Sequence, residues 1–470
     1  MRSKATRVTS SVVFLVLLTV WALPAFAEVQ NVKVSGDITA RAFHRSNLDL
    51  TSGSTPAAPL SNGEDFIMST IGLNVAADLT ENVSTFIRLA NEHDWGVNAL
   101  NPNDNSNASL SQGYVTLKEL FYAPLTVKLG RQPVVWGRGF VLGSGLLPNT
   151  ILGAGDLNAA IAANEFTDFT AFDALRATLD LSNVGGMSLP LTADYVYIKL
   201  AENAVGKGDD VRLQGLNLST KFNQLNSEAE LYFLNKFDQS PSGASRAEDG
   251  STSTLGLRGS AQPVEGSSVW AELAYQFGTT VTDSEAILAS GAGQSGWAAN
   301  LGADYTFKNV ATTPKVGAEW RYYSGRDSDT AAAGWSPVAP GYFTTALREF
   351  QTRSTVTGFY PNTQAGVTSG QTNQHELAVF GGLKPMEDLG INSRLSWFVL
   401  DVPAKAPGAN SNRNRFLGTE WDTQLKYDYT DDVQFGFLYA LFLPGNVFRN
   451  VDTGGRNTPQ ELVTTVSVKF

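Results

Sequence analysis

Eighteen segments in which apolar and polar residues alternate run through this chain, and they restrict its possible folds more than any other feature. A period of two is typical of β-strands with one apolar and one polar face. Most of the segments are long enough for a tilted strand to cross a bilayer. They cover residues 32–44, 64–79, 83–94, 110–121, 125–138, 171–182, 188–200, 210–222, 226–238, 251–261, 267–279, 295–308, 314–324, 373–384, 391–402, 415–429, 432–444 and 459–470.

The connections between these segments alternate in length. After each even-numbered segment the link is tight, as at residues 80–82 and 430–431, whereas after odd-numbered segments it is usually much longer, as at residues 139–170 and 325–372. Outer-membrane barrels have tight turns on the periplasmic side and long loops outside. The sequence therefore predicts an all-β fold, a transmembrane antiparallel β-barrel of about 18 strands with short periplasmic turns and long extracellular loops.

The last segment has the pattern of a closing barrel strand. Leu462, Thr464, Val466, Val468 and Phe470 fall on one side of it, and mostly polar residues fall on the other. In an outer-membrane barrel the apolar side meets lipid, and a terminal aromatic ring lies at the membrane–water boundary. Both ends of the chain are then predicted to lie in the periplasm.

The amino-terminal residues resemble an export signal. Arg2, Lys4 and Arg7 precede an apolar run at residues 12–23, and the small residues of 24–27 offer a cleavage site. The run is too short for a stable membrane helix, so residues 1–27 are predicted to be a secretory signal peptide. Residues 28–470 are predicted to form one barrel domain in the bacterial outer membrane.

Composition supports this class and excludes others. The chain has no Cys, so it cannot be a disulfide scaffold. The 26 Phe, 14 Tyr and 9 Trp, beside only 17% charged residues, suit strands with aromatic girdles. The formal net charge of −11 argues against a nucleic-acid partner.

The polar faces of the segments carry charged residues, and these are predicted to face the lumen. A Lys or Arg on the lipid face costs about 2–4 kcal/mol at the bilayer midplane. In segments 188–200 and 210–222 the phase of the alternation is ambiguous, and a bulge could shift it. The lumen-lining and selectivity candidates are Arg88, Lys128, Gln132, Arg176, Arg258, Glu272, Asp304, Glu319, Arg321, Arg394, Glu420, Asp422 and Lys426.

These lumenal charges have two interpretations of similar weight. In one, they form the wall of a polar conduit that selects solutes by charge. In the other, they form salt bridges that only solvate and brace a wide barrel. Acidic and basic candidates are interleaved, and paired opposite charges on one strand, such as Glu319 and Arg321, favour bracing.

Catalytic, metal and cofactor sites find little support. The three histidines, His44, His93 and His375, are predicted to be polar residues near strand ends, and no thiolate or hydrolase motif is present. Residues 101–107 and 327–329 are rich in oxygen ligands but lack the spacing of a calcium loop. No enzyme activity, metal or cofactor is predicted.

The two longest connections, residues 139–170 and 325–372, are predicted to matter most for passage through the barrel. Connections of this length commonly fold inward and constrict the lumen, or bind something outside. The second contains several aromatic residues together with Arg348 and Arg353. Such residues suit stacking on sugar rings, and they equally suit a cluster that holds the connection still, which is the slightly favoured interpretation.

Three stretches resemble the alginate-export family of outer-membrane barrels. They are residues 129–139 (LGRQPVVWGRG), 172–180 (FDALRATLD) and 417–448, where a G-x-E-x-D strand is followed by an aromatic strand ending in F-x-P-G. The resemblance implies an eighteen-stranded passive conduit for an anionic polysaccharide. The matching positions are Arg131 and Gln132 in the first stretch, Asp173 and Arg176 in the second, and Glu420 and Asp422 in the third.

The sequence thus predicts a porin-like channel for passive passage of a hydrophilic, charged solute or polysaccharide. A path for a polyuronate is expected to be lined densely with Arg and Lys, whereas here acids interleave with bases. The predicted partners are outer-membrane lipid or lipopolysaccharide and the solute. An alternative is a structural barrel that sheathes a periplasmic partner, such as a multihaem electron-transfer protein; a barrel enzyme ranks last.

Overall fold

The computed structural model describes thirteen stretches of the chain, which include all of its strands. They are residues 31–48, 63–96, 108–122, 124–143, 163–182, 189–201, 210–239, 250–279, 293–325, 334–350, 371–403, 414–447 and 457–470. The predicted signal peptide at residues 1–27 and the oxygen-rich stretches at 101–107 and 327–329 lie outside these residues. In the described part, no helix is long and apolar enough to cross a membrane.

Eighteen strands make up most of the described structure. They are β1 (Asn31–Ser46), β2 (Glu64–Thr80), β3 (Val83–Asp94), β4 (Ser109–Leu117), β5 (Leu125–Gln132), β6 (Phe172–Asp180), β7 (Leu191–Ala201), β8 (Val211–Phe222), β9 (Ser227–Asp238), β10 (Gly250–Ala261), β11 (Ser267–Thr279), β12 (Gly293–Thr306), β13 (Lys315–Tyr323), β14 (Gln374–Met386), β15 (Leu389–Leu400), β16 (Phe416–Asp428), β17 (Val433–Pro444) and β18 (Gln460–Lys469). Four short helical turns accompany them, namely η1 (Leu120–Tyr122), η2 (Asn164–Phe166), η3 (Gln224–Asn226) and η4 (Ala346–Phe350).

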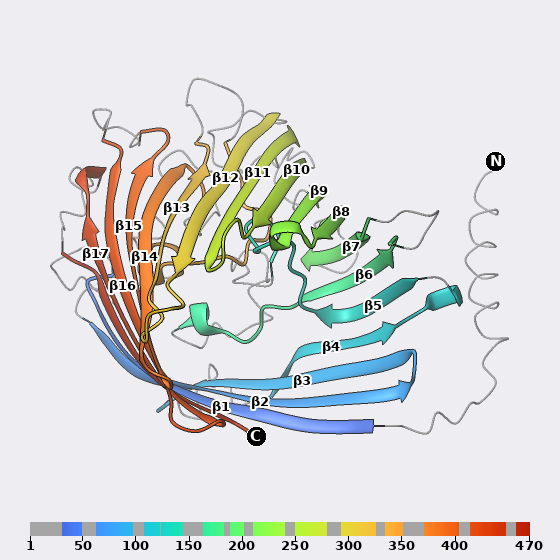
Figure 1. The fold of residues 1–470 in the computed structure, drawn as a ribbon, viewed down its shortest axis with the longest axis horizontal. Coiled ribbons are helices and arrows are strands. Elements are labelled where there is room, and N and C mark those ends of the chain that lie inside the picture. Colours follow the sequence, from blue (N-terminus) through green and yellow to red (C-terminus); the bar gives the residue numbers. More distant parts are fainter. Residues whose placement is uncertain are drawn as a thin grey trace.

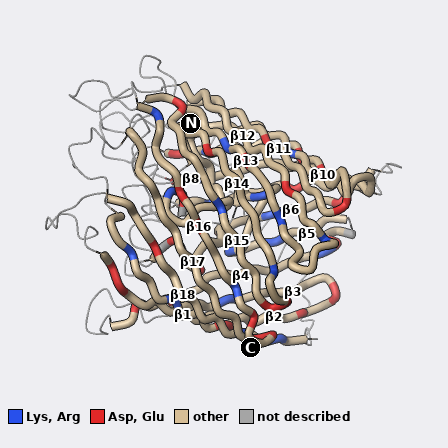
Figure 2. The backbone as a smooth tube through the Cα atoms, turned by 60° about the vertical axis from the view of Figure 1, so that its left-hand side comes forward, with Lys and Arg blue, Asp and Glu red and all other residues tan. Residues whose placement is uncertain are grey.

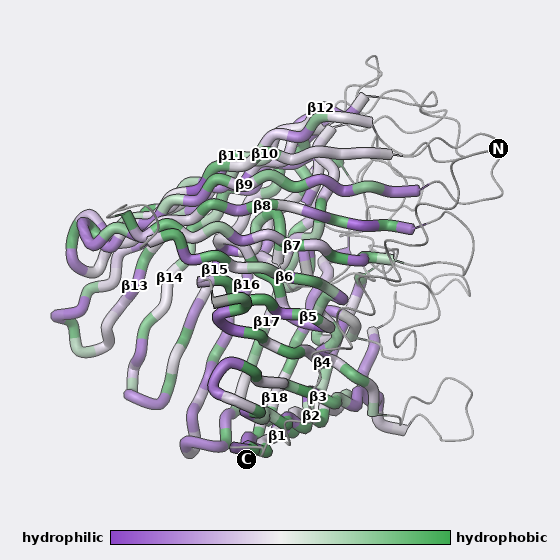
Figure 3. Tube along the Cα trace, turned by 90° about the vertical axis from the view of Figure 1, so that its right-hand side faces the viewer, coloured by the Kyte–Doolittle hydropathy of each residue, from purple (hydrophilic) through white to green (hydrophobic). Residues whose placement is uncertain are grey.

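The strands form one closed antiparallel sheet. Each strand pairs with its neighbours in the chain, and β1 pairs with both β2 and β18, so that the sheet has no free edge. Figure 1 shows the ring, and Figure 3 shows the tight turns gathered at one end of it. The predicted fold, an antiparallel barrel of eighteen strands, is confirmed.

The two faces of the sheet differ as the alternation predicts. On β10, Leu257 is 60% exposed, whereas its neighbour Arg258 is only 7% exposed. The exposed apolar side chains form the outer face of the barrel, and aromatic rings stack on it, as Tyr322 does on Trp320 and His375. Charged residues occur along the same strands (Figure 2), and those that are buried, such as Arg258 on β10 and Arg321 on β13, lie on the inner face.

One predicted segment is much too long. Residues 125–138 were expected to form a single strand, but β5 ends at Gln132. Pro133 follows and cannot donate to a ladder hydrogen bond. Gly137 and Gly139 then adopt positive φ angles of 56° and 79°, which other residues rarely adopt. The chain therefore leaves the barrel wall six residues earlier than predicted, and turns into the interior.

Strands β7 and β8 explain the ambiguous phase of their sequence. Their outer faces carry exposed Tyr195, Tyr197 and Leu216, and their inner faces carry the buried Ile198 and Leu213. The pairing between the two strands also shifts by one residue near Ala201, which is the bulge that the sequence left open. Because both faces are apolar here, something other than water must cover the inner one.

Candidate functional site

Two chain segments inside the barrel cover the apolar inner wall. Residues 134–142 supply Val134, Trp136, Phe140, Val141 and Leu142, and residues 335–339 supply Trp335, Val338 and Ala339. Together with inward-facing residues of β6 to β9 and β11 to β13 they form one buried cluster. We call this cluster the apolar dock. Its wall residues are Phe172, Ala174, Val196, Ile198, Leu200, Leu213, Tyr232, Leu234, Ala274, Ala298 and Tyr323.

The two segments also bond to each other through their backbones. The Gly143 amide donates to the Ala339 carbonyl at 2.8 Å, and the Gly341 amide donates to the Gly139 carbonyl at 2.8 Å. Their approach is so close that a Cβ atom on Gly143 would lie 2.9 Å from the Gly341 backbone. Glycine is therefore required at this crossing, which joins the two segments into one inner layer.

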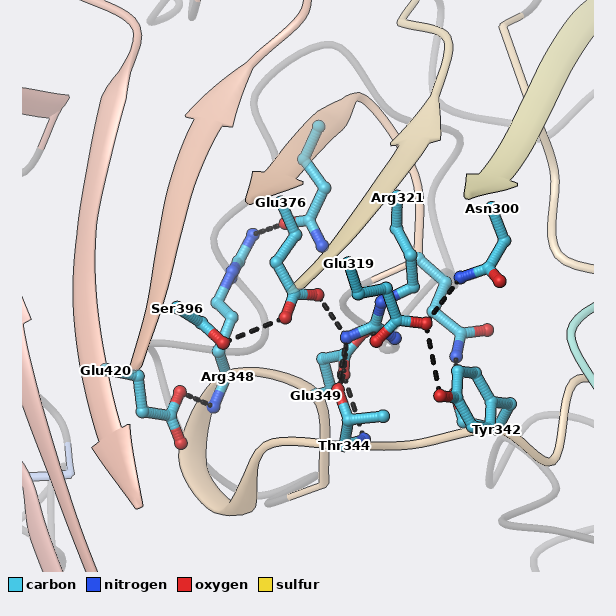
Figure 4. A network of polar contacts seen from close by, with 12 residues as sticks. Asn300, Glu319, Arg321, Tyr342, Thr344, Arg348, Glu349, Glu376, Ser396 and Glu420 are labelled. Atoms are coloured by element: carbon cyan, nitrogen blue, oxygen red, sulfur yellow. Dashed lines mark hydrogen bonds and ion pairs between the residues drawn. The ribbon is translucent and has the colours of Figure 1, made fainter. Parts of the chain in front are cut away.

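The second part of this layer is held by charge. Arg321 on β13 binds Glu349 at 2.7 Å and also binds Glu376 on β14. Arg394 on β15 binds Glu319 at 2.9 Å and Glu376 at 2.7 Å. Figure 4 shows Glu319, Arg321 and Glu376 converging on residues 342–349 from neighbouring strands.

Backbone and tyrosine contacts complete this attachment. The amides of Leu347 and Arg348 donate to the Glu420 carboxylate on β16 at 2.6 and 2.9 Å. The Tyr342 hydroxyl donates to Glu319 at 3.1 Å and accepts a hydrogen bond from Arg138 at 2.7 Å. Burial raises the pKa of Tyr342, and the neighbouring Glu319 raises it further, so the hydroxyl stays protonated and can donate. We call the attachment of residues 342–350 to β13–β16 the charged dock.

A third inner segment, residues 163–170, binds the opposite wall. Asp168 accepts hydrogen bonds from Arg88 on β3 at 2.9 Å, and Arg88 also binds Asp37 on β1 at 2.7 Å. The Thr167 hydroxyl donates to Glu92 at 2.9 Å. Phe166 contacts the Phe43 ring, 5.4 Å between centroids. The described parts of both long connections thus fold inward, which is one of the two arrangements that their length suggested.

The predicted arginines are all ion-paired, and several of the predicted acids are bound as well. Arg176 binds Asp194 at 2.8 Å, and Arg258 binds Glu228 and Glu230, both at 2.6 Å. Asp304 binds Lys315, and Glu272 accepts a hydrogen bond from the Tyr232 hydroxyl. The Gln132 amide donates to the carbonyls of Lys128, Gly130 and Ala174. Arg88, Arg321, Arg394, Glu319 and Glu420 have the partners given above.

Lys128 and Lys426 differ from the other predicted bases, because neither forms an ion pair with any residue that the structure describes. Lys128 lies over the Tyr114 ring, with its Nζ atom 4.5 Å from the ring centroid. It faces Arg176 directly across the β5–β6 pair. Two like charges in this position repel each other. The wall therefore carries a positive charge here that has no acidic partner among the described residues.

The alternation of apolar and polar residues does not predict several residues of the site. Arg138, Arg348 and Glu349 lie on the inner segments, where no strand periodicity predicts their direction. Arg45 on β1 is completely buried and binds Glu461 on β18 at 2.7 Å. Asp194 is also absent from the predicted residues, since it lies on β7, where the phase of the alternation is ambiguous. Glu461 lies on β18, whose polar face the alternation does predict.

The interior differs between its two ends. Toward the long connections, inward side chains such as Glu92, Tyr323 and Phe442 are buried. Toward the tight turns, inward Lys33, Lys426 and Lys469 are exposed. The inner layer therefore fills the half of the lumen next to the long connections, and the other half is open.

The histidines take part in surface contacts. His375 lies on the outer face, with Nε2 3.5 Å from an Asp401 oxygen, and His44 lies 2.6 Å from Asp65 near the end of β1. His93 alternates with the inward Glu92 and Asp94 on β3. Within the described residues no cluster of three His, Asp or Glu could hold a metal ion.

Comparison with known proteins identifies the family. The model of the alginate-export family matches residues 33–460. Among solved structures, Pseudomonas aeruginosa OccK2 (OpdF), in complex with glucuronate, is 12% identical with a TM-score of 0.54 over 94% of this chain and 98% of that chain.

Two further structures agree on the fold. Pseudomonas aeruginosa OpdQ is 11% identical with a TM-score of 0.52, over 94% of this chain and 98% of that one. Acinetobacter baumannii OccAB2 is 9% identical with a TM-score of 0.51, over 94% and 99%. No curated protein sequence matches the chain. The protein belongs to the alginate-export family and is a channel-type β-barrel of the bacterial outer membrane.

Proposed function

We propose that the barrel passes a hydrophilic anionic solute by diffusion, through a lumen that a fixed inner layer narrows at its extracellular half. The observation that carries this proposal is the inner layer itself. It is attached to the wall on two sides, by the apolar dock and by the charged dock, while the periplasmic half of the same lumen keeps exposed polar side chains. Width and field, rather than binding energy, then decide what passes.

The sign of the preferred charge follows from which charges a solute can reach. Glu319, Glu376 and Glu420 have side chains that are almost completely buried and bound by arginines or backbone amides. The accessible wall near the inner layer includes Arg176, whose side chain is 29% exposed, and Lys128 opposite it. A carboxylate passing this point would meet cations of which one has no acidic partner in the described structure.

The relatives support a carboxylate-bearing solute without identifying it. The family carries the description alginate export, and one structural neighbour is in complex with glucuronate. Both names concern uronic acids, whose carboxylate suits a lysine–arginine pair. Because acidic residues interleave with the bases, we propose small uronates or short oligomers rather than a dedicated polymer track.

Conductance in planar lipid bilayers tests this proposal. We expect discrete current steps and, in a salt gradient, a reversal potential of the sign given by anion preference. Replacing the two facing cations, in K128Q with R176Q, is expected to reduce that preference, and added glucuronate is expected to reduce the current less in this variant than in the wild type. A reversal potential of the opposite sign contradicts the anionic preference.

The matched control is K308Q. Lys308 is exposed beside the tight turn after β12 and binds Glu265 at 3.2 Å, so its loss removes one positive charge away from the inner layer. The alternative role as a sheath for a periplasmic protein predicts a barrel without current steps. The inner layer disfavours that role, since it occupies the space that an enclosed partner would need.

A further inference from the structure

The charged dock holds more acid than base. Five carboxylates and three guanidinium groups converge there, so full ionisation leaves two negative charges in excess. Their side chains are all buried, the most accessible being that of Arg394 at 12%. The acids are Glu319, Glu349, Glu376, Glu420 and Asp422, and the bases are Arg321, Arg348 and Arg394.

Among the residues that the structure describes, the elements next to the charged dock do not supply the missing charge. On the β12 side the nearest base, Arg138, donates to the Tyr342 hydroxyl and lies over the Trp270 ring. On the β17 and β18 side, Ala440 and Phe442 are uncharged, and Glu461 is bound by Arg45. Within the described residues no metal-binding cluster is present either.

The excess is concentrated on β16. Glu420 and Asp422 are two residues apart and so point to the same inner face. Glu420 accepts two backbone hydrogen bonds from residues 347 and 348. Asp422 lies beside Glu420 and the Ala346 amide, and neither of its oxygens accepts a hydrogen bond of normal geometry. Two buried carboxyl groups this close repel each other when both are ionised, so a proton shared between them stabilises the docked arrangement.

Glu349, on the inner segment itself, also favours proton uptake in the docked state. Its burial raises the pKa of the carboxyl group, and the nearby Glu376 raises it further, against the lowering effect of Arg321. When residues 344–350 leave the wall, this group and the β16 pair regain water. The docked state therefore binds more protons than the released state.

We propose that the charged dock is a proton-operated latch, which holds residues 344–350 against β13–β16 in acid and loosens as the pH rises. For each proton that the docked state binds and the released state does not, the ratio of docked to released molecules falls as the pH rises. The fall is up to about tenfold per pH unit while that group titrates. Under the proposed channel function, on which only the electrical consequence rests, the lumen is narrower at pH 5 than at pH 8.

Hydrogen exchange on the full barrel in detergent micelles tests the latch without relying on current. The amides of Leu347 and Arg348 are protected by their bonds to Glu420. We expect the protection factor of residues 344–350, corrected for the intrinsic pH dependence of exchange, to fall at least about tenfold between pH 5 and pH 8. Equal protection at both pH values in the wild type would overturn the proposal.

Two conservative variants and one control sharpen the test. D422N and E420Q each remove one carboxyl group but keep its shape, and either is expected to reduce the loss of protection of residues 344–350 between pH 5 and pH 8, because Glu349 still titrates. E265Q removes an exposed carboxyl group from a tight turn and is expected to respond to pH like the wild type. If the folded variant, D422N or E420Q, loses protection with pH as the wild type does, the latch does not reside in this pair.

Bilayer currents then separate the latch from the channel. A rise in conductance with pH that is smaller in D422N than in the wild type supports both. Loss of protection with pH in a barrel that carries no current supports the latch and rejects the proposed function. A pH-dependent current with constant protection of residues 344–350 rejects the latch and leaves the channel standing.

Discussion

The apolar dock and the charged dock hold the same inner layer by different means. In the apolar dock, Trp136 and Leu142 pack on Ile198, Leu213 and Leu234 of the wall, all of them buried. In the charged dock, arginines and carboxylates from four strands meet residues 342–350. One attachment excludes water from hydrocarbon, and the other replaces water around ions.

This difference determines how each attachment can respond. Apolar packing is non-directional and nearly independent of pH and salt, so it can fix the layer but cannot report on the surroundings. Buried ion pairs recover their desolvation cost only when every partner is present. The attachment of the layer at β7–β9 is therefore insensitive to pH and salt, whereas its attachment at β13–β16 depends on them.

The largest expected effect comes from removing the central cation of the charged dock. Arg321→Met leaves the buried Glu349 without its arginine and leaves Glu376 with Arg394 alone, and we expect the free energy of unfolding to fall by about 3–5 kcal/mol. Urea unfolding of the barrel in lipid vesicles measures it. The double variant Arg321→Met with Glu349→Gln is expected to recover part of the loss. No recovery would mean that this pair is not the origin of the cost.

Truncation in the apolar dock is expected to cost somewhat less. Leu142→Ala leaves a cavity between the inner layer and the wall, and we expect a loss of about 2–5 kcal/mol in the free energy of unfolding. The same measurement at pH 5 and pH 8 should give the same loss, because no charge is involved. Leu142→Met, which conserves volume, is the control and should cost under about 1.5 kcal/mol. A loss that changes with pH would erase the distinction between the docks.

A polar contact outside the lumen gives a smaller, pH-dependent effect. Burial raises the pKa of Asp401, but His375, the Gly325 amide and Tyr322 together bring it below its ordinary value. Its stabilising effect is therefore present above the ordinary pKa and is lost as the pH falls through the lowered one. We expect Asp401→Asn to destabilise the barrel at pH 7 and to match the wild type at pH 2. Equal differences at both pH values would contradict this assignment.

An exposed ion pair is expected to give the smallest change in the free energy of unfolding. The side chains of Lys308 and Glu265 are 59% and 84% exposed. We expect Lys308→Gln to change the free energy of unfolding by less than about 1 kcal/mol, and to do so less at high salt. A change as large as that of Arg321→Met would show that burial is not what distinguishes the charged dock.

The sequence predicts the charged dock better than the apolar one. Glu319, Arg321 and Arg394 lie on strands where polar and apolar residues alternate cleanly, so their inward direction can be read from their neighbours. Ile198 and Leu213 lie on strands that are apolar on both faces, where alternation has no phase. That ambiguity is itself informative, because an apolar inner wall in a water-filled barrel requires a covering layer.

The inner layer itself was predicted only in outline. The length of residues 139–170 and 325–372 indicates inward folding, but no periodicity tells which side chains meet which strand, so Arg348 and Glu349 could not be assigned partners. The early end of β5 had a signal in Pro133, Gly137 and Gly139. It was outweighed by the apolar residues between them, which proved to pack in the lumen.

Arg45 links the first and last strands in a way that bears on how the barrel is assembled. Its guanidinium group binds Glu461 on β18 and Glu165 in the third inner segment, and it lies over the Phe43 and Phe66 rings. One buried arginine therefore joins the β1–β18 seam to residues 163–170 inside the barrel. A barrel that closed without these residues would leave this arginine with one acidic partner fewer, so closure of the seam and docking of the inner segment favour each other.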